Sequence, residues 1–403
     1  MPGITDTPDI DLVDGGFYVD DPQPKYEWMR KNAPVYFDDR NGVWGLASYE
    51  AVIAASKDPS TFSSAGGIRP DSGPIPMMID MDDPEHWTRR KLVNKGFTPG
   101  RVRESAQKIR DVCDGIIDAV CEQGECDFVH DIAAPLPMIM IGDMLGVAPE
   151  DRDDLLQWSD DMVSAQSGNA TEAQYTKAME AMQGYTAFCT HAVAERQAQP
   201  TDDLMSVLVH AEVDGDHLDP DEVLHESLLI LVGGDETTRH VVSGGMEQLL
   251  LHPEQRKLLL DDPARIPVAV EEMLRWVSPI KNMCRTATHD VEFMGQQLQA
   301  GQKCMLLYES ANRDEGKFTE PYRFDVERQP NEHVAFGFGS HYCLGQALAR
   351  LELNVMFEQL LTRLPDLELA ADSDSLPRRR ANFISGLESM PVRFTPSAPG
   401  RNS

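Results

Sequence analysis

The order of apolar and polar positions predicts a chain that is mainly helical. Apolar residues recur at intervals of three and four from about residue 86 to residue 198, as a buried helix face requires. Residues 219–251 have the pattern of one unusually long helix, which Asp219-Pro220 opens. Other helices are predicted over 138–145 and 173–194, from Pro267 onward, and over 344–361.

A smaller part of the chain has β-type patterns. Short runs of strand-forming residues lie at 35–37 and 43–47, and the alternating segment 291–307, with glycines at 295 and 301, predicts a hairpin. Between these parts, residues 61–84 predict a Gly/Pro-rich loop with the apolar insert Ile75-Pro76-Met77-Met78-Ile79. A loop this apolar is expected to cover a binding site.

The chain has no internal repeat and no linker, which favours a single domain over residues 17–395. The expected fold class is mainly α with a small β-rich part. Residues 1–16 and 396–403 carry charge and turn formers without periodicity, so they are expected to be flexible tails.

Composition and charge exclude several classes of protein. Of 403 residues, 41% are hydrophobic and 26% are charged, which is ordinary for a globular protein. The net charge of -31 makes nucleic acid an unsuitable partner. Seven cysteines without a CxxC pair indicate a reducing compartment, and no apolar run is long enough for a membrane span or a signal peptide. A soluble, cytoplasmic protein is expected, acting as a monomer.

The strongest chemical signal is a glycine-framed cysteine. In Phe336-Gly337-Phe338-Gly339-Ser340-His341-Tyr342-Cys343-Leu344-Gly345, the cysteine opens a predicted helix. The positive end of a helix stabilises a thiolate, and glycines let a flat ligand approach the backbone closely. The segment therefore favours ligation of a planar cofactor through sulfur over an inert buried thiol.

A second signal lies inside the long predicted helix, at Gly233-Gly234-Asp235-Glu236-Thr237-Thr238. Two glycines inside a helix cost about 1 kcal/mol each relative to alanine, so a compensating role is expected. The hydroxyl of Thr237 can bond the carbonyl of Gly233 and bend the helix. Both a dioxygen-binding groove and a close helix crossing fit this pattern.

The third signal is an acid and a base three residues apart, Glu272 and Arg275, with Arg328 farther along. Taken alone, such a pair is usually a surface ion pair of little value. Together, the three signals resemble the cytochrome P450 family of haem-thiolate monooxygenases, and the resemblance covers nearly the whole of residues 17–395.

This resemblance implies the family fold, with a long central helix and a cysteine loop before the last long helix, and haem b as cofactor with dioxygen as co-substrate. It implies that Cys343 is the iron ligand and that Glu236 and Thr237 protonate oxygen. It also implies that Glu272, Arg275 and Arg328 form a buried ion network. The other implied haem contacts are His86, Arg90, Arg285, His341, Phe336, Gly337, Gly345 and Gly233.

Within the family, the likeness is greatest to the mycobacterial sterol 26/27-hydroxylases, which oxidise a terminal methyl of the cholesterol side chain. An apolar lining suited to a sterol such as cholesterol or cholest-4-en-3-one is expected from Ile75, Met77, Met78, Ile79, Val232, Met283 and Phe383. Oxidation beyond the alcohol, to the acid, is a further option. The alternatives are a fatty-acid hydroxylase, a peroxide-driven peroxygenase, and a non-catalytic haem carrier or gas sensor.

The chain has no flavin or iron–sulfur motif, so electrons are expected from a ferredoxin and an NAD(P)H-dependent ferredoxin reductase. Residues 86–103 form a basic island in an acidic protein. Its cations Arg89, Lys91 and Lys95 are expected to face outward beside the haem and to attract an acidic ferredoxin.

Overall fold

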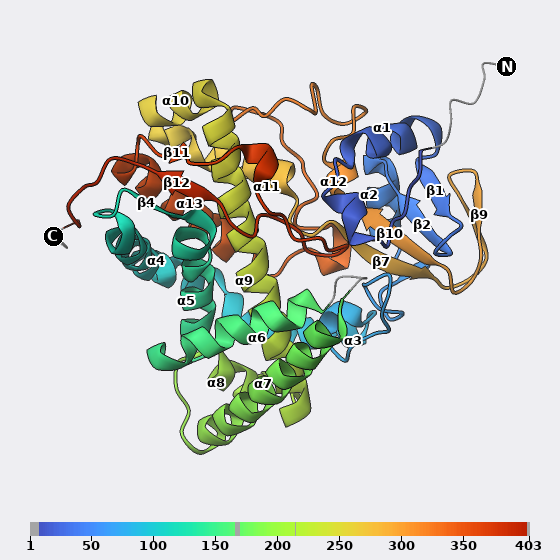
Figure 1. The fold of residues 1–403 in the computed structure, drawn as a ribbon. Coiled ribbons are helices and arrows are strands. Elements are labelled where there is room, and N and C mark those ends of the chain that lie inside the picture. The colour runs from blue at the N-terminus through green and yellow to red at the C-terminus, as the bar shows by residue number, and fades with distance from the viewer. Residues whose placement is uncertain (1–7, 166–169, 214, 401–403) are drawn as a thin grey trace.

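The computed structural model describes residues 8–165, 170–213 and 215–400. Helices gather around one long central helix, and a small sheet lies to one side (Figure 1). The helices are α1 (Gln23–Asn32), α2 (Tyr49–Lys57), α3 (Glu85–Val93), α4 (Pro99–Val120), α5 (Pro135–Met144), α6 (Arg152–Ser164), α7 (Glu172–Ala198), α8 (Leu204–His210), α9 (Pro220–Leu251), α10 (Pro253–Asp261), α11 (Ile266–Val277), α12 (Tyr308–Ala311) and α13 (Gln346–Arg363).

The strands are short. They are β1 (Val35–Asp38), β2 (Val43–Leu46), β3 (Phe62–Ser63), β4 (Glu125–Asp127), β5 (Glu212–Val213), β6 (Asp216–His217), β7 (Asn282–Ala287), β8 (Val291–Phe293), β9 (Gln296–Leu298), β10 (Lys303–Leu307), β11 (Glu368–Leu369) and β12 (Pro391–Arg393). The predicted class, mainly α with a small β-rich part, is confirmed.

The long helix α9 has 32 residues and begins where the sequence predicts it. The Asp219 side chain accepts from the backbone N–H of Glu222, and the Glu222 side chain accepts from that of Asp219, which satisfies two free donors of the first turn. Pro220 stands at the first helical position, where no N–H is needed. Pro253 ends α9 by opening α10, a helix that the sequence pattern missed.

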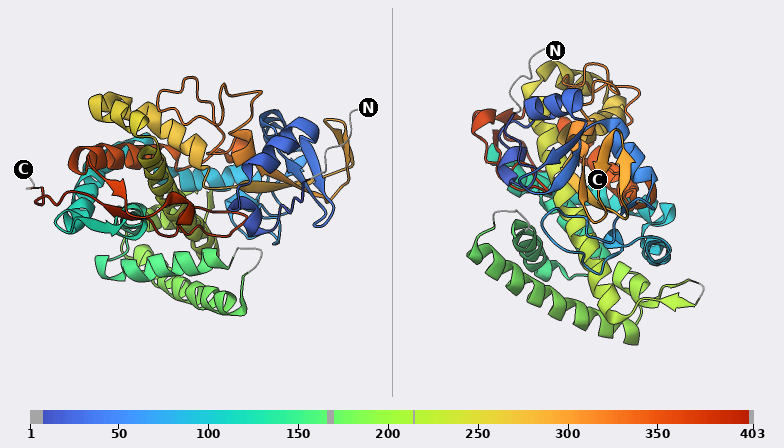
Figure 2. Two further views of the ribbon diagram at one scale, coloured as in Figure 1. Left: turned by 45° about the horizontal axis from the view of Figure 1, so that its top comes forward. Right: turned by 90° about the vertical axis from the view of Figure 1, so that its right-hand side faces the viewer.

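Two hydrophobic cores meet at α9. The C-terminal half of α9 packs Val242 and Met246 into a core shared with α4, α11 and α13. The N-terminal half packs Val223 and Leu231 into a second core shared with α5, α6, α7 and α8. Figure 2 shows α9 passing through the molecule, with α6 and α7 as a separate layer on one side. The glycine pair of α9 lies between the two cores.

The main sheet has the strand order β1-β2-β10-β7-β3. The predicted hairpin over 291–307 is confirmed only in its first half, where β8 pairs with β9 around Gly295 at φ +82°. The strand β10 instead pairs in parallel with β2 and antiparallel with β7. Every residue of β10 from Cys304 to Leu307 is buried, so it takes the sheet centre rather than the exposed hairpin.

The predicted flexible tail at residues 1–16 is wrong in its second half. Ile10 and Leu12 are 4% and 0% exposed, and the Leu12 backbone N–H donates to Asp38 at 2.9 Å. Two apolar residues in an acidic segment are too few to give a hydrophobic periodicity in the sequence. They are nevertheless enough to anchor this segment against β1 and β2. The first half of this tail, and residues 401–403 of the C-terminal tail, lie outside the described residues. Within the described ranges, no helix is both long and apolar enough to span a bilayer.

Candidate active site

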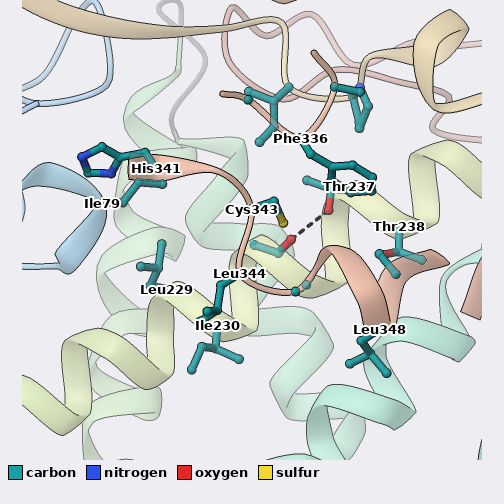
Figure 3. A pocket seen from close by; sticks show the side chains of 18 of the residues that line it. Ile79, Leu229, Ile230, Thr237, Thr238, Phe336, His341, Cys343, Leu344 and Leu348 are labelled. Atoms are coloured by element: carbon teal, nitrogen blue, oxygen red, sulfur yellow. Dashed lines mark hydrogen bonds between the residues drawn. The ribbon is translucent and has the colours of Figure 1, made fainter. Parts of the chain in front are cut away.

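An open cavity lies where α9 passes the start of α13, with about 1310 Å³ of empty space when the solvent at its mouth is included. Its wall comes from α3, α5, α9, α13, the loop before α3 and the cysteine loop. Figure 3 shows Cys343 of the cysteine loop and Thr237 of α9 pointing into the same space, with Ile230 and Leu229 farther along α9. Cavities of this kind, apolar with a few converging polar groups, are the usual form of a small-molecule site.

The cysteine loop presents the Cys343 sulfur at the N-terminus of α13. The Cys343 backbone N–H donates to the Phe336 carbonyl at 2.9 Å, and Gly337 adopts φ +70°, which favours glycine. Burial raises the pKa of the Cys343 thiol, whereas the backbone N–H groups of Gly345 and Gln346 and the nearby Arg90 and Arg350 lower it. The pKa of the thiol stays raised overall, and the helix-end N–H groups are the part of its surroundings that favours a thiolate.

Basic side chains gather at the other edge of the cavity. The rings of His86 and His341 stack with centroids 4.0 Å apart, and both line the cavity together with Arg90. Burial, together with the charges of Arg285, His86 and Arg90, lowers the pKa of His341 to about 2. The Nε2 atom of His86 is buried and has no hydrogen-bond partner among the described residues. Nδ1 of His86 donates to the Asp83 carboxylate at 3.0 Å, so Nε2 donates to an anionic group when the imidazole is protonated. With the guanidinium of Arg90 beside it, this edge is suited to bind anionic groups.

The two glycines of α9 have different roles. The Thr237 hydroxyl donates to the Gly233 carbonyl at 2.8 Å, as predicted (Figure 3). A Cβ on Gly233 would meet no atom within 4 Å, because this residue faces the cavity. A Cβ on Gly234 would lie 2.6 Å from the Ile141 side chain of α5. Gly233 therefore gives open space, and Gly234 permits the close helix crossing.

The Glu236 carboxylate does not line the cavity beside Thr237, and its part in an acid–alcohol pair stays a prediction. Its carboxylate is fully buried and bound by Arg239 and, at 2.6 Å, by Arg379. Burial alone would raise the pKa of Glu236, but Arg239, His240 and Arg379 lower it well below its ordinary value. This carboxylate stays ionised, and Thr238 lines the cavity in its place.

Sequence analysis missed a buried acid in the cavity wall, Glu352 of α13. Burial and the neighbouring Asp235 raise the pKa of Glu352 to about 8, and burial raises that of Asp235 to about 8 as well. The sequence contains a signal for this buried acid, because Glu352 lies on the apolar stripe of α13, four residues after Leu348 and one before Leu353. A charged residue on a core face indicates a special site.

The raised pKa of Glu352 predicts a specific pH dependence. The folded pKa lies above the ordinary value of 4.5, so this group contributes stability below pH 4.5 that is lost as the pH rises through 8. Between pH 6 and pH 8, the unfolding free energy of the Glu352→Gln variant should fall by about 2 kcal/mol less than that of the wild-type protein. The reason is that release of one proton changes this free energy by about 1.4 kcal/mol per pH unit. The measurement is urea unfolding of the haem-loaded protein at both pH values. The control Glu358→Gln, on the exposed side of α13, should keep the wild-type slope; equal slopes for both variants would contradict the assignment.

Three of the seven residues predicted for the apolar lining lie in the cavity wall. Met78, Ile79 and Met283 line the cavity, together with Leu229 and Ile230 of α9. The other four predicted residues do not: Ile75, Met77 and Val232 pack with the core beneath α9, and Phe383 packs with Ile68 and Ile384. Arg285 is not among the lining residues, although its charge acts on His341. The pattern identified apolar residues correctly, but only the fold decides which side of a segment faces the cavity.

The residues of the predicted ion network are in contact and buried. Arg275 binds both oxygens of Glu272 at 2.7 Å, and Arg328 donates to Glu272 at 3.0 Å. Glu272 and Arg275 are 0% exposed. The Arg275 guanidinium also donates to the carbonyls of Asn312 and Pro321, which fixes the loops that lead to the cysteine.

Of the three cations predicted to face outward, Lys91 and Lys95 are exposed, and the prediction is wrong for Arg89. Arg89 is turned inward and forms ion pairs with Glu222 and Glu226 of α9. Lys95 is exposed, as predicted, and its ammonium group donates to the backbone carbonyl of Glu212. Lys91 remains exposed and lies over the ring of Trp87, itself 54% exposed.

The comparisons with known proteins agree with this site. The family model described as Cytochrome P450 matches residues 266–385. The chain is 58% identical to a steroid C26-monooxygenase of Mycobacterium tuberculosis, over 98% of this chain and 100% of that protein, and 58% identical to one of Mycolicibacterium smegmatis, over 97% and 98%. The structure of Mycobacterium marinum cytochrome P450 CYP268A2 in complex with pseudoionone superposes with a TM-score of 0.88, at 33% identity, covering 97% of this chain and 100% of that one.

The chain therefore belongs to the cytochrome P450 family. It is a haem-dependent monooxygenase, an oxidoreductase that uses dioxygen. The site fits this cofactor: a sulfur at a helix N-terminus faces the cavity, Gly233 leaves open space, and the basic edge holds Arg90 and a buried ring nitrogen of His86 without a partner among the described residues. Two haem propionates need such a cationic edge when they are buried.

Proposed function

We propose that the protein hydroxylates a terminal methyl of a sterol side chain, with cholesterol or cholest-4-en-3-one as substrate. The observation that carries this proposal is the 58% identity, over nearly the full length, to proteins named steroid C26-monooxygenase. The cavity supports it, because Met78, Ile79, Met283, Leu229 and Ile230 give an apolar and adaptable wall for a rigid hydrocarbon.

The test is a titration of the ferric protein with a ligand panel, followed by product analysis. Cholest-4-en-3-one should shift the spin state by displacing the iron-bound water and should give the terminal alcohol or acid. Long-chain fatty acids should do so more weakly. Turnover of fatty acids with no turnover of either sterol would overturn the proposal, and turnover driven by peroxide alone would favour a peroxygenase. Haem binding without reductant-dependent oxygen consumption would favour a sensor or carrier.

We propose these roles for the residues of the site. Cys343 would hold the haem iron through its sulfur, and a thiolate there would supply the electron density on which oxygen activation in this family depends. His86, Arg90, His341 and Arg285 bind the propionates, and the charge of Arg285 acts on the His341 ring. Phe336, Gly337 and Gly345 shape the sulfur side, and Gly233 leaves space on the other side. The haem, when bound, supplies the oxygen-activating chemistry of the family.

We predict that Thr237→Ala uncouples the enzyme. The Thr237 hydroxyl faces the cavity while bonded to Gly233, so it is placed to organise protons at bound oxygen. The variant should keep substrate affinity but divert NADH electrons to peroxide or water, with product per NADH falling about tenfold. The measurement is NADH use, peroxide and product in one assay. Thr237→Ser should restore most coupling; wild-type coupling in Thr237→Ala would remove this role.

We propose that the electrons come from a ferredoxin and its NAD(P)H-dependent reductase, and that the protein is cytoplasmic. All seven cysteines are free thiols, which supports a reducing compartment. Lys91 and the exposed Trp87 lie on α3, whose Arg90 contacts the carbonyl of Tyr342 in the cysteine loop. This face combines an exposed cation with an exposed aromatic ring beside the sulfur, as a docking site for an acidic partner requires.

Lys91→Glu should slow reduction by ferredoxin about tenfold at low salt, with a weaker effect at high salt, because opposite charges steer the encounter. Substrate affinity should not change. The control Lys177→Glu, on α7, reverses an exposed charge on another helix and should leave the rate as it is. Equal rates in both variants would place the docking site elsewhere.

A further inference from the structure

A carboxylate that the monooxygenase mechanism does not use connects three parts of the cavity wall. Glu226 lies on α9, one turn before Ile230, and its side chain is 0% exposed. Its Oε1 atom accepts from the backbone N–H of Met78 at 2.8 Å and from Arg89 of α3 at 3.3 Å. One oxygen atom thus joins α9, α3 and the apolar loop, which is the insert 75–79 with its flanking residues in the loop 61–84.

The apolar loop has its own internal support, which does not reach α9. Asp80 accepts from the backbone N–H groups of Ile68 and Ile75, both at 2.8 Å, and so shapes the loop from within. The bond from Met78 to Glu226 connects this shaped loop to the central helix. Since Met78 and Ile79 both line the cavity, the bond fixes how far they enter it.

Packing alone does not explain a carboxylate at this position. The Oε2 atom of Glu226 is buried with no hydrogen-bond partner among the described residues, and burial raises the pKa of Glu226 to about 7 despite Met78 and Arg89. A leucine would fill the same space without that penalty. The residue thus lowers stability locally, in a place where it holds a backbone N–H of the cavity wall.

We propose that Glu226 is a positioning residue that closes the apolar loop on the substrate cavity and sets how deeply a substrate enters. The proposal rests on the proposed function only for the identity of that substrate. Through Arg89, the same carboxylate holds α3, the helix that carries His86 and Arg90. The loop and the basic edge of the cavity are thereby held from one point on α9.

Hydrogen exchange of the substrate-free, haem-loaded protein tests the tie directly. Glu226→Leu removes the acceptor, so amides of residues 75–81 should exchange about tenfold faster. Glu226→Gln keeps an oxygen acceptor for the Met78 N–H and should restore protection. If the leucine variant does not fold, Glu226→Asp, which keeps the charge but is too short to reach Met78, should show the same loss. Wild-type exchange in the folded leucine or aspartate variant would overturn the proposal.

The matched control is Glu222→Gln on the same helix. It removes the other ion pair of Arg89 but leaves Met78 bound, and glutamine still accepts the Asp219 N–H of the helix cap. Loop exchange should stay at the wild-type rate in this variant. An increase equal to that in Glu226→Leu would mean that the Arg89 charge, rather than the Met78 bond, holds the loop, and would overturn the proposal.

Substrate binding gives a second and separate readout. With cholest-4-en-3-one, Glu226→Leu should weaken binding about tenfold and give products oxidised at more than one carbon, whereas Glu226→Gln should keep the terminal product. If no sterol binds the wild-type protein, the proposed function fails while the exchange result still stands. If sterols bind and the variants neither open the loop nor spread the products, the role of Glu226 fails.

Discussion

Cys343→Ser should abolish the thiolate-type carbon monoxide spectrum and lower turnover about a thousandfold or more. The cavity holds the Cys343 sulfur where backbone N–H groups of Gly345 and Gln346 stabilise negative charge. A serine hydroxyl at that place stays protonated at neutral pH and does not supply the electron density of a thiolate. The measurement is the spectrum of the reduced protein with carbon monoxide, together with haem content and turnover.

The control for this variant is Cys126→Ser. Cys126 is half-buried like Cys343 but lies on β4, outside the cavity lining. Its replacement should leave spectrum and turnover unchanged. A wild-type spectrum in Cys343→Ser would make the ligand assignment wrong, and loss in both variants would indicate a general effect of removing a thiol.

Glu272→Gln should cost about 3–5 kcal/mol of unfolding free energy, the usual effect of removing one partner of a buried ion pair. Glu272 is 0% exposed and faces two guanidinium groups, Arg275 and Arg328. It also accepts from the backbone N–H of Asp325 at 2.9 Å. The amide cannot neutralise both cations, so the segment leading to the cysteine loop should loosen and haem content should fall. The measurement is the urea midpoint with the haem content of the purified protein.

The neighbouring Glu271 provides a matched control. It binds Arg350 and His333, its side chain is 26% exposed, and its pKa is lowered to about 2 by these partners against the effect of burial. Because water shares in its solvation, Glu271→Gln should cost about 1 kcal/mol or less. Equal losses in the two variants would show that burial of Glu272 has no special weight.

The local features of the site could be predicted from the sequence because they depend on neighbours in the chain. Thr237 reaches the Gly233 carbonyl because a helix places residues four apart on one face. Cys343 meets free N–H groups because it stands where α13 begins. Capping residues and prolines set both ends of α9. Periodicity and end signals contain this information, and the structure agrees with them.

Side-chain direction could not be predicted in the same way. Arg89 is one residue from Arg90, yet Arg89 turns to Glu226 while Arg90 reaches Tyr342. Glu236 is one residue from Thr237, yet Arg239 and Arg379 draw it away from the cavity. Arg379 is more than a hundred residues away along the chain, so no local pattern reveals this contact.

The sequence by itself determined the helices, the glycine-framed cysteine and the family, since these depend on spacing and on residue type. Only the tertiary structure decided which charges are exposed and which apolar residues face the cavity. The physical reason is that an ion pair or a cavity wall needs two or more segments brought together. A buried charge is costly unless it is paired, so each one binds the partner that the fold brings near. Glu226, which accepts from Met78 and Arg89, is an example.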